Sequence, residues 1–283
     1  MAAVAVITDS TSDLDAATQF ATGAGVVPLF VHFGDARYRD SVDLSRDDFY
    51  AKLNAETQLP TTSQPTPAMF EEAFRPFVEA SRPIVCLTIM ASLSGTINAA
   101  TAAARAFAGA DIRIVDSGTV SGGLYLQARH AADLARAGAD ADAIVAALAR
   151  DRKLERGYAT IPDLSHAVRT GRVSRAQAFI GSLVKIVPVL RIDGGRIEEE
   201  ARVRTFARAQ ETMVAAAARD ANAGAAARVC LIHTRAPELA QALGARLHDR
   251  IVADLQSFDV IEAGPVIGTH AGTGAVGIFV LPC

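Results

Sequence analysis

The sequence predicts an α/β fold with mainly parallel sheets, built as two domains or as one large one. Short β-branched runs alternate with longer segments of helical periodicity, which is typical of βαβ units. The chain has 283 residues, more than one hydrophobic core usually spans, and 50% of its residues are hydrophobic. A charged stretch at 151–156 is a candidate connection, so we expect one domain over 1–156 and a second over 157–283.

In the first half, predicted strands and helices alternate. The expected strands are 4–8, 26–33, 84–89 and 112–116. The expected helices, which carry apolar residues at helical spacing, are 13–22, 67–80, 95–107, 121–137 and 140–154. Ser12 can cap the first helix, and Pro67 suits the first turn of the helix that it opens.

The second half continues the alternation with a different kind of turn. The expected strands are 158–161, an apolar stretch at 182–192, and 229–233, 260–262 and 276–281. The expected helices are a segment after Asp163, then 205–221 and 237–250. Residues 193–195 read Asp-Gly-Gly and predict a tight turn toward 196–197.

Composition excludes several classes of protein. A net charge of -3 gives no general attraction to nucleic acid, which requires a concentrated basic surface. The start of the chain lacks a signal-peptide pattern, and no apolar stretch is long enough to span a bilayer. The cysteines and histidines lack the spacing of a metal site or a disulfide framework. We therefore expect a cytoplasmic protein without stable membrane insertion, metal or cofactor.

Hydroxyl-rich and glycine-rich turns follow or precede several predicted strands. They occupy residues 8–12, 92–96 and 264–272, and a further polar stretch, 61–65, lies in a connector. In an α/β sheet, ligands bind outside the carboxyl ends of the strands, where hydroxyls and helix-start amides can converge on an anion. These turns therefore predict a site for a carboxylate or a phosphate.

The same residues also have ordinary structural interpretations. Ser94 could simply cap a helix, 61–67 could be a polar loop, and a lone histidine such as His270 is more often structural. Asp9 and Asp116 follow strands without a D-x-D pair, and we interpret them as acceptors that hold loops. The alternative is a hydrolase or phosphotransfer enzyme that uses Asp9, Asp116 and His270.

Five motifs, taken in order, resemble the DegV family: T-D-S-T-S-D-L, T-S-Q-P, S-L-S-G-T, G-R-V-S and G-P-x-I-G-x-H-x-G. The resemblance extends from Ile7 to Ile278. It implies two α/β domains with a ligand between them, and a protein that binds a long-chain fatty acid. Some members of the family present the lipid to the catalytic subunit of a bacterial fatty acid kinase, which is the implied partner. One departure is Gly272-Thr273-Gly274, where the family usually has G-P-G.

The resemblance also assigns roles to individual residues. It implies that Thr62, Ser94 and His270 hold the fatty-acid carboxylate, with the Gly95 amide as a further donor. The supporting positions are Ser63, Ser92, Asp9 and Ser10. The basic positions nearest the partner-facing surface are Arg172, Arg202 and Arg204. The candidate wall of the acyl tunnel is formed by Phe179, Ile180, Leu183, Val184, Ile186, Val187 and Ile267.

The resemblance predicts a lipid-binding carrier subunit and not an enzyme by itself. The sequence has no G-x-x-x-x-G-K-[ST] nucleotide loop, which agrees with a phosphoryl donor bound by another subunit. A third hypothesis is a regulatory module that senses small anions. Chain length separates the hypotheses, because a carrier prefers long acids and an anion sensor binds short carboxylates as tightly.

Overall fold

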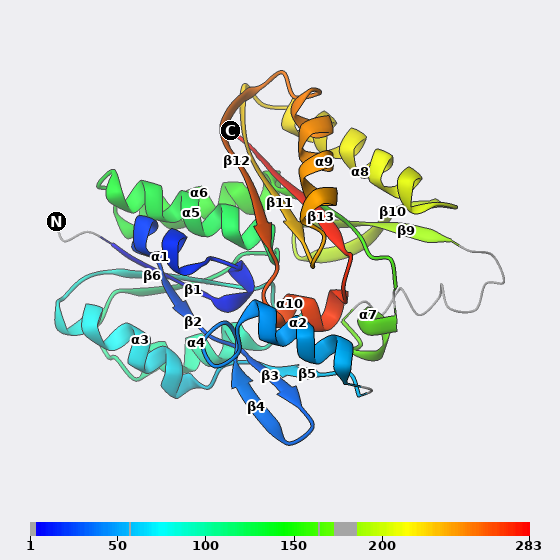
Figure 1. Ribbon diagram of the computed structural model, residues 1–283. Helices are drawn as coiled ribbons and strands as arrows, with labels where there is room; N and C mark the ends of the chain where they lie inside the picture. Colours follow the sequence, from blue (N-terminus) through cyan, green and yellow to red (C-terminus); the bar gives the residue numbers. More distant parts are fainter. Residues whose placement is uncertain (1–3, 57, 164, 173–185) are drawn as a thin grey trace.

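The computed structural model describes residues 4–56, 58–163, 165–172 and 186–283 (Figure 1). A four-stranded parallel sheet with the order β2-β1-β6-β7 occupies the first half of the chain. Its strands are β1 (Ala5–Asp9), β2 (Gly25–Val27), β6 (Ile84–Thr88) and β7 (Ile112–Asp116). The prediction of a parallel sheet with helical crossovers is confirmed for this half.

Helices cover both faces of the parallel sheet. One face carries α3 (Pro67–Glu79) and α4 (Thr96–Arg105), and the other carries α5 (Gly122–Arg136) and α6 (Ala141–Leu154). Pro67 occupies the first turn of α3, as predicted. The predicted cap of the first helix is wrong, because Asp15 caps α1 (Ala16–Thr22) by accepting from the Thr18 amide. Ser12 instead lies in the short 3-10 helix η1 (Ser10–Ser12).

The second half forms a six-stranded sheet with the order β10-β9-β8-β13-β11-β12. Its strands are β8 (Arg156–Thr160), β9 (Val187–Asp193), β10 (Arg196–Val203), β11 (Ala226–His233), β12 (Asp254–Glu262) and β13 (Val276–Pro282). The prediction of a mainly parallel sheet is wrong here, since only β11 and β12 pair in parallel.

The antiparallel pairing has two origins, a hairpin turn and the position of the last strand. The predicted tight turn is Gly194–Gly195, whose φ angles of 54° and 93° suit a two-residue hairpin loop between β9 and β10. The last strand, β13, also inserts antiparallel between β8 and β11. Part of the predicted apolar stretch 182–192 becomes β9, and its residues up to 185 lie outside the described ranges.

Helix α5 lies between the two large sheets, while α8 (Phe206–Ala221) and α9 (Pro237–His248) cover the outer face of the six-stranded sheet (Figure 1). One hydrophobic cluster joins Val6 and Leu87 of the parallel sheet to Phe279 of β13. The layers are therefore packed through a shared core at α5. The division at 156/157 stays a prediction, although β8 begins at Arg156.

A small antiparallel sheet with the order β4-β3-β5 was not predicted from the sequence. It contains β3 (Phe30–Phe33), β4 (Ala36–Arg39) and β5 (Thr61–Ser63). The predicted strand 26–33 is interrupted at Pro28, so β2 and β3 belong to different sheets. Three short helices complete the structure: α2 (Arg46–Ala55), α7 (Ser165–Arg169) and α10 (Pro265–Ala271).

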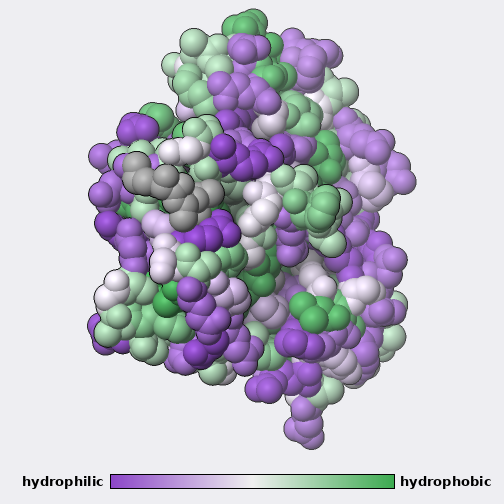
Figure 2. Space-filling view, turned by 90° about the vertical axis from the view of Figure 1, so that its left-hand side faces the viewer, coloured by the Kyte–Doolittle hydropathy of each residue, from purple (hydrophilic) through white to green (hydrophobic). Residues whose placement is uncertain are grey.

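The surface shown in Figure 2 is mostly hydrophilic, with hydrophobic residues in several separate patches. Strongly exposed large hydrophobic side chains include Phe20 on α1 and Val252 in the loop before β12. Within the described residues, none of the helices combines the length and the apolar character needed to cross a membrane.

Candidate ligand-binding site

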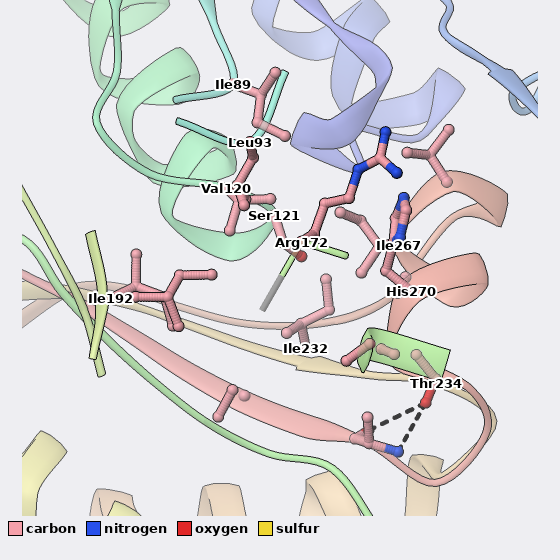
Figure 3. A pocket seen from close by; sticks show the side chains of 18 of the residues that line it. Ile89, Leu93, Val120, Ser121, Arg172, Ile192, Ile232, Thr234, Ile267 and His270 are labelled. Carbon is pink, nitrogen blue, oxygen red and sulfur yellow. Dashed lines mark hydrogen bonds between the residues drawn. The ribbon is translucent and has the colours of Figure 1, made fainter. Parts of the chain in front are cut away.

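A cavity of about 390 Å³ lies between the carboxyl edge of the parallel sheet and one face of the six-stranded sheet. Its upper wall comes from the loops that follow β6 and β7, and its lower wall from β8, β9, β11 and β13. Helix α10 closes one end (Figure 3). Cavities of roughly 300–1,000 Å³ with apolar walls and a few polar groups are typical of small-molecule sites.

The polar end of the cavity is built around His270. The hydroxyl of Thr62, on β5, lies 2.9 Å from Nε2 of His270, on α10. These two residues are far apart in the sequence, and they meet because α10 packs against β3 and β5. The structure therefore places residues of 61–65 and of 264–272 beside the same cavity.

Ser94 and Gly95 line the same cavity as Thr62 and His270. The Ser94 hydroxyl lies 2.8 Å from the Thr96 hydroxyl and accepts from the Thr96 amide at 3.3 Å, just before α4. A Cβ at Gly95 would lie 2.2 Å from Oε1 of Gln64, so the Gln64 side chain packs directly against the Gly95 backbone. The loop before α4 thus packs closely against the end of β5, and its residue Ser94 lines the cavity.

The imidazole of His270 is held in its neutral form. Burial lowers its pKa from 6.5 to about 4, and the positive charges of Arg172 and His166 add to this effect. Its Nδ1 atom is buried and has no hydrogen-bond partner among the described residues. A bound anion would supply the negative charge that this end of the cavity lacks.

The rest of the cavity is apolar. Figure 3 shows Ile192, Val120 and Leu93 on the side away from His270, with Ile232 and Ile267 between the ends. The strands of the six-stranded sheet provide one side of this surface, including Ile192 on β9 and Ile232 on β11, because alternate residues of a strand face the same side. The cavity therefore has a polar end and a long apolar wall, which fits an amphipathic ligand.

Several predicted site residues lie outside the cavity wall. Asp9 accepts from the Ile89 amide at 2.8 Å, and Ser10 accepts from the Leu29 amide at 3.0 Å. Ser92 donates to the Gly195 carbonyl in the β9–β10 turn at 2.8 Å. Each of these side chains contacts a loop beside the cavity and is not among the described residues that line it. Ser63 does line it, with its hydroxyl 2.8 Å from the His32 ring.

The three arginines predicted for the partner-facing surface have different positions. Arg172 is exposed and lines the mouth of the cavity near His270 (Figure 3). Arg202, on β10, pairs with Glu199 at 2.6 Å, and Arg204 is exposed after the end of β10. Asp116, the other candidate acid, accepts from the Ala91 and Gly118 amides and pairs with Arg152.

Of the described residues predicted for the tunnel wall, only Ile267 lines the cavity. Phe179, Ile180, Leu183 and Val184 lie outside the described ranges, and Ile186 and Val187 are not among the described residues that line the cavity. The wall that sequence reasoning missed comes from regular strands. Its main members are Ala159, Leu190, Ile192, Ile197, Ile232 and Phe279. Period-two alternation in β9 and β13 was the available signal.

Four polar liners were also missed: Gln64, Ser121, His233 and Thr234. Gln64 lies within the polar stretch 61–65, Ser121 precedes α5, and His233 is the last residue of β11. In the described part of the chain, no cluster of histidine, cysteine, aspartate or glutamate side chains is arranged to hold a metal ion.

Fold and site together define a class: a layered α/β protein with a largely apolar cavity that ends in hydroxyls and a neutral histidine. The chain belongs to the DegV family, whose model matches residues 3–283. A DegV domain-containing protein of Streptomyces coelicolor is 37% identical over 278 residues, which cover 98% of each chain. Protein DegV of Bacillus subtilis is 31% identical over 280 residues, covering 97% of this chain and 98% of the relative.

Solved structures of the family share the fold. A Thermus thermophilus DegV family protein, described as binding fatty acid, superposes with a TM-score of 0.92 at 30% identity and 99% coverage of both chains. Bacillus subtilis DegV, described as a fatty acid binding protein, gives a TM-score of 0.89 at 30% identity, again over 99% of both chains. The predicted DegV-like α/β fold is therefore confirmed.

Proposed function

We propose that this protein binds a long-chain fatty acid, with its carboxylate at Thr62, Ser94, Gly95 and His270 and its acyl chain in the apolar cavity. The observation that carries the proposal is the cavity itself, which is polar at one end and apolar along its length. Two relatives of known structure are described as fatty-acid-binding proteins, which supports the same ligand class.

The two ends of the ligand have different roles in this proposal. About 0.8 kcal/mol is gained per buried methylene, so some fourteen methylenes contribute on the order of 11 kcal/mol before ordering costs. Hydroxyl donors and the Gly95 amide orient the carboxylate. The acyl chain therefore supplies affinity, and the polar end fixes the direction in which the ligand lies.

The protein is proposed to act as a cytoplasmic carrier that presents the carboxylate to a separate fatty acid kinase subunit. Arg172 supports this step, because it is exposed and lies at the cavity mouth beside His270. Arg202 and Arg204 are proposed to face the same partner. An arginine suits a phosphoryl-transfer partner because its guanidinium recognises phosphate oxygens bidentately.

The alternative, an enzyme using Asp9, Asp116 and His270, has less support. Asp9 is fully buried and accepts from the Thr11 and Ile89 amides. Asp116 accepts hydrogen bonds from two backbone amides and forms an ion pair with Arg152. Neither Asp9 nor Asp116 is among the described residues that line the cavity. These contacts favour the role of loop-holding acceptors for both acids.

The direct test is the lipid content of protein purified from bacteria. We expect mass spectrometry of a denatured extract to find a long-chain fatty acid in near-stoichiometric amount. Delipidated protein should then bind a fluorescent fatty acid, and unlabelled palmitate should displace this probe. Protein that carries no lipid and fails to bind the fluorescent probe would contradict the proposal.

The carboxylate site is tested by Thr62→Ala. A hydrogen bond to a charged group contributes about 1.5–3 kcal/mol, so this substitution should weaken palmitate binding roughly 10-fold to 100-fold. The matched control is Thr61→Ala, the same change one residue earlier on β5, where the exposed side chain does not line the cavity. Equal affinities for the two variants would remove Thr62 from the site.

A further inference from the structure

The buried segment from Asp9 to Asp13 contacts the walls of the cavity without lining it. Asp9 accepts a hydrogen bond from the Ile89 amide, and Ser10 accepts one from the Leu29 amide. Ile89 and Leu29 both line the cavity. Asp13 makes the longest connection in sequence. Its Oδ1 accepts from the Gly264 amide at 2.7 Å, and its Oδ2 accepts from the Ser121 hydroxyl at 2.7 Å.

The two partners of Asp13 are the N-cap residues of two helices, α10 and α5. Gly264 precedes α10, which carries His270 and Ile267, and Ser121 precedes α5 and lines the cavity itself. One carboxylate thus joins the amino-terminal ends of both helices. The guanidinium of Arg46, at the start of α2, adds a third element by donating to the Asp13 carbonyl at 3.0 Å.

Two residues of this network, Asp13 and Ser121, have strained backbone conformations. Asp13 has a φ of 57° and Ser121 has a φ of 55°, so both non-glycine residues lie in the left-handed half of φ space. Strained backbone persists only where the surroundings fix it, and it concentrates at functional sites. The hydrogen bond between the two side chains is one such restraint, and it lies beside the proposed ligand.

We propose that Asp13 is a positioning residue, which sets the distance between α5 and α10 and thereby holds His270 against Thr62 at the polar end of the cavity. The proposal rests on the proposed function for its ligand, but its geometric part concerns His270 alone. A residue that only stabilised the fold would leave the affinity of the folded protein unchanged.

The test compares three variants at positions 12 and 13. Asp13→Gly removes the carboxylate without backbone cost, because glycine adopts positive φ freely. Asp13→Asn also tolerates this φ, and its amide can accept from Gly264 and donate to the Ser121 hydroxyl. Ser12→Ala is the matched control, since the buried Ser12 hydroxyl has no hydrogen-bond partner among the described residues.

Asp13→Gly is expected to raise the Kd for a fluorescent fatty acid about tenfold, the loss expected when displacement of His270 removes one hydrogen bond to the ligand carboxylate. Asp13→Asn should restore affinity to within about threefold of wild type, and Ser12→Ala should bind as wild type does. The second readout is the NMR titration of the His270 ring. In Asp13→Gly the pKa of His270 should rise from about 4 toward its usual 6.5, because the ring is no longer held in its buried position.

If Asp13→Gly does not fold, Ser121→Ala serves instead. It removes only the donor to Oδ2, and the same rise in the His270 pKa is expected, because the effect reaches α10 through Asp13. A folded Asp13→Gly protein with wild-type affinity and an unmoved His270 titration would overturn the inference. Wild-type protein that binds no fatty acid would overturn the proposed function, while the His270 titration would still decide the role of Asp13.

Discussion

Laurate is expected to bind about 200-fold more weakly than palmitate, because each of its four missing methylenes removes about 0.8 kcal/mol of burial. The apolar wall runs from Ile267 near His270 to Ile192 on the other side of the cavity, so a shorter chain leaves part of this wall without a partner (Figure 3). Isothermal titration below the critical micelle concentration measures both constants. If the protein were instead a sensor of small anions, short and long acids would bind with equal affinity.

A substitution at the apolar end sharpens this test. Ile192 is buried and lines the cavity across from His270, so Ile192→Phe should shorten the space for the acyl chain (Figure 3). We expect it to weaken palmitate binding more than laurate binding. Val260→Phe is the matched control, because Val260 is 42% exposed and lies away from the cavity wall. Equal losses for both acids would mean that the acyl chain does not reach Ile192.

The regular elements of this fold were readable from the sequence because their patterns are local. β7 was predicted with its observed bounds, α5 is one residue shorter than predicted at each end, and α8 begins one residue later than predicted. Pairing direction was less accessible, since β13 reaches its antiparallel position only through contacts far along the chain. Helix α2 was missed because it is mostly polar and buries only Phe49, Tyr50 and Leu53.

The candidate site divides in the same way. Thr62 and His270 were recognised through motifs, and the structure places the Thr62 hydroxyl 2.9 Å from Nε2 of His270. Asp9 and Ser10 belong to an equally recognisable motif, yet they contact the cavity walls from behind. A motif therefore indicates that a segment is near the site, but not which side chains face the ligand. That distinction depends on the strand register and on how α10 packs.

The largest expected effect on stability comes from Glu155, which is buried at the C-terminal end of α6 and faces α5. Its carboxylate accepts from the Thr119 hydroxyl at 2.6 Å and from the Gln127 amide at 2.7 Å. Burial raises its pKa from 4.5 to about 7, despite these two hydrogen bonds. The folded state therefore binds a proton more tightly than the unfolded state, and the stability from this group is lost as the pH rises from about 4.5 through about 7.

Glu155→Gln should remove this pH dependence, because the amide has the same shape and does not titrate. Between pH 5 and pH 8 the free energy of unfolding of wild type should fall by about 2 kcal/mol more than that of the variant. Urea denaturation at several pH values measures the difference, in which contributions from the other buried acids cancel. Thr119→Val should make stability fall more steeply with pH than in wild type. It removes a donor that favours the charged form of Glu155, so the pKa of Glu155 rises further. Parallel pH profiles for wild type and Glu155→Gln would show that Glu155 is ionised in the folded protein throughout this range.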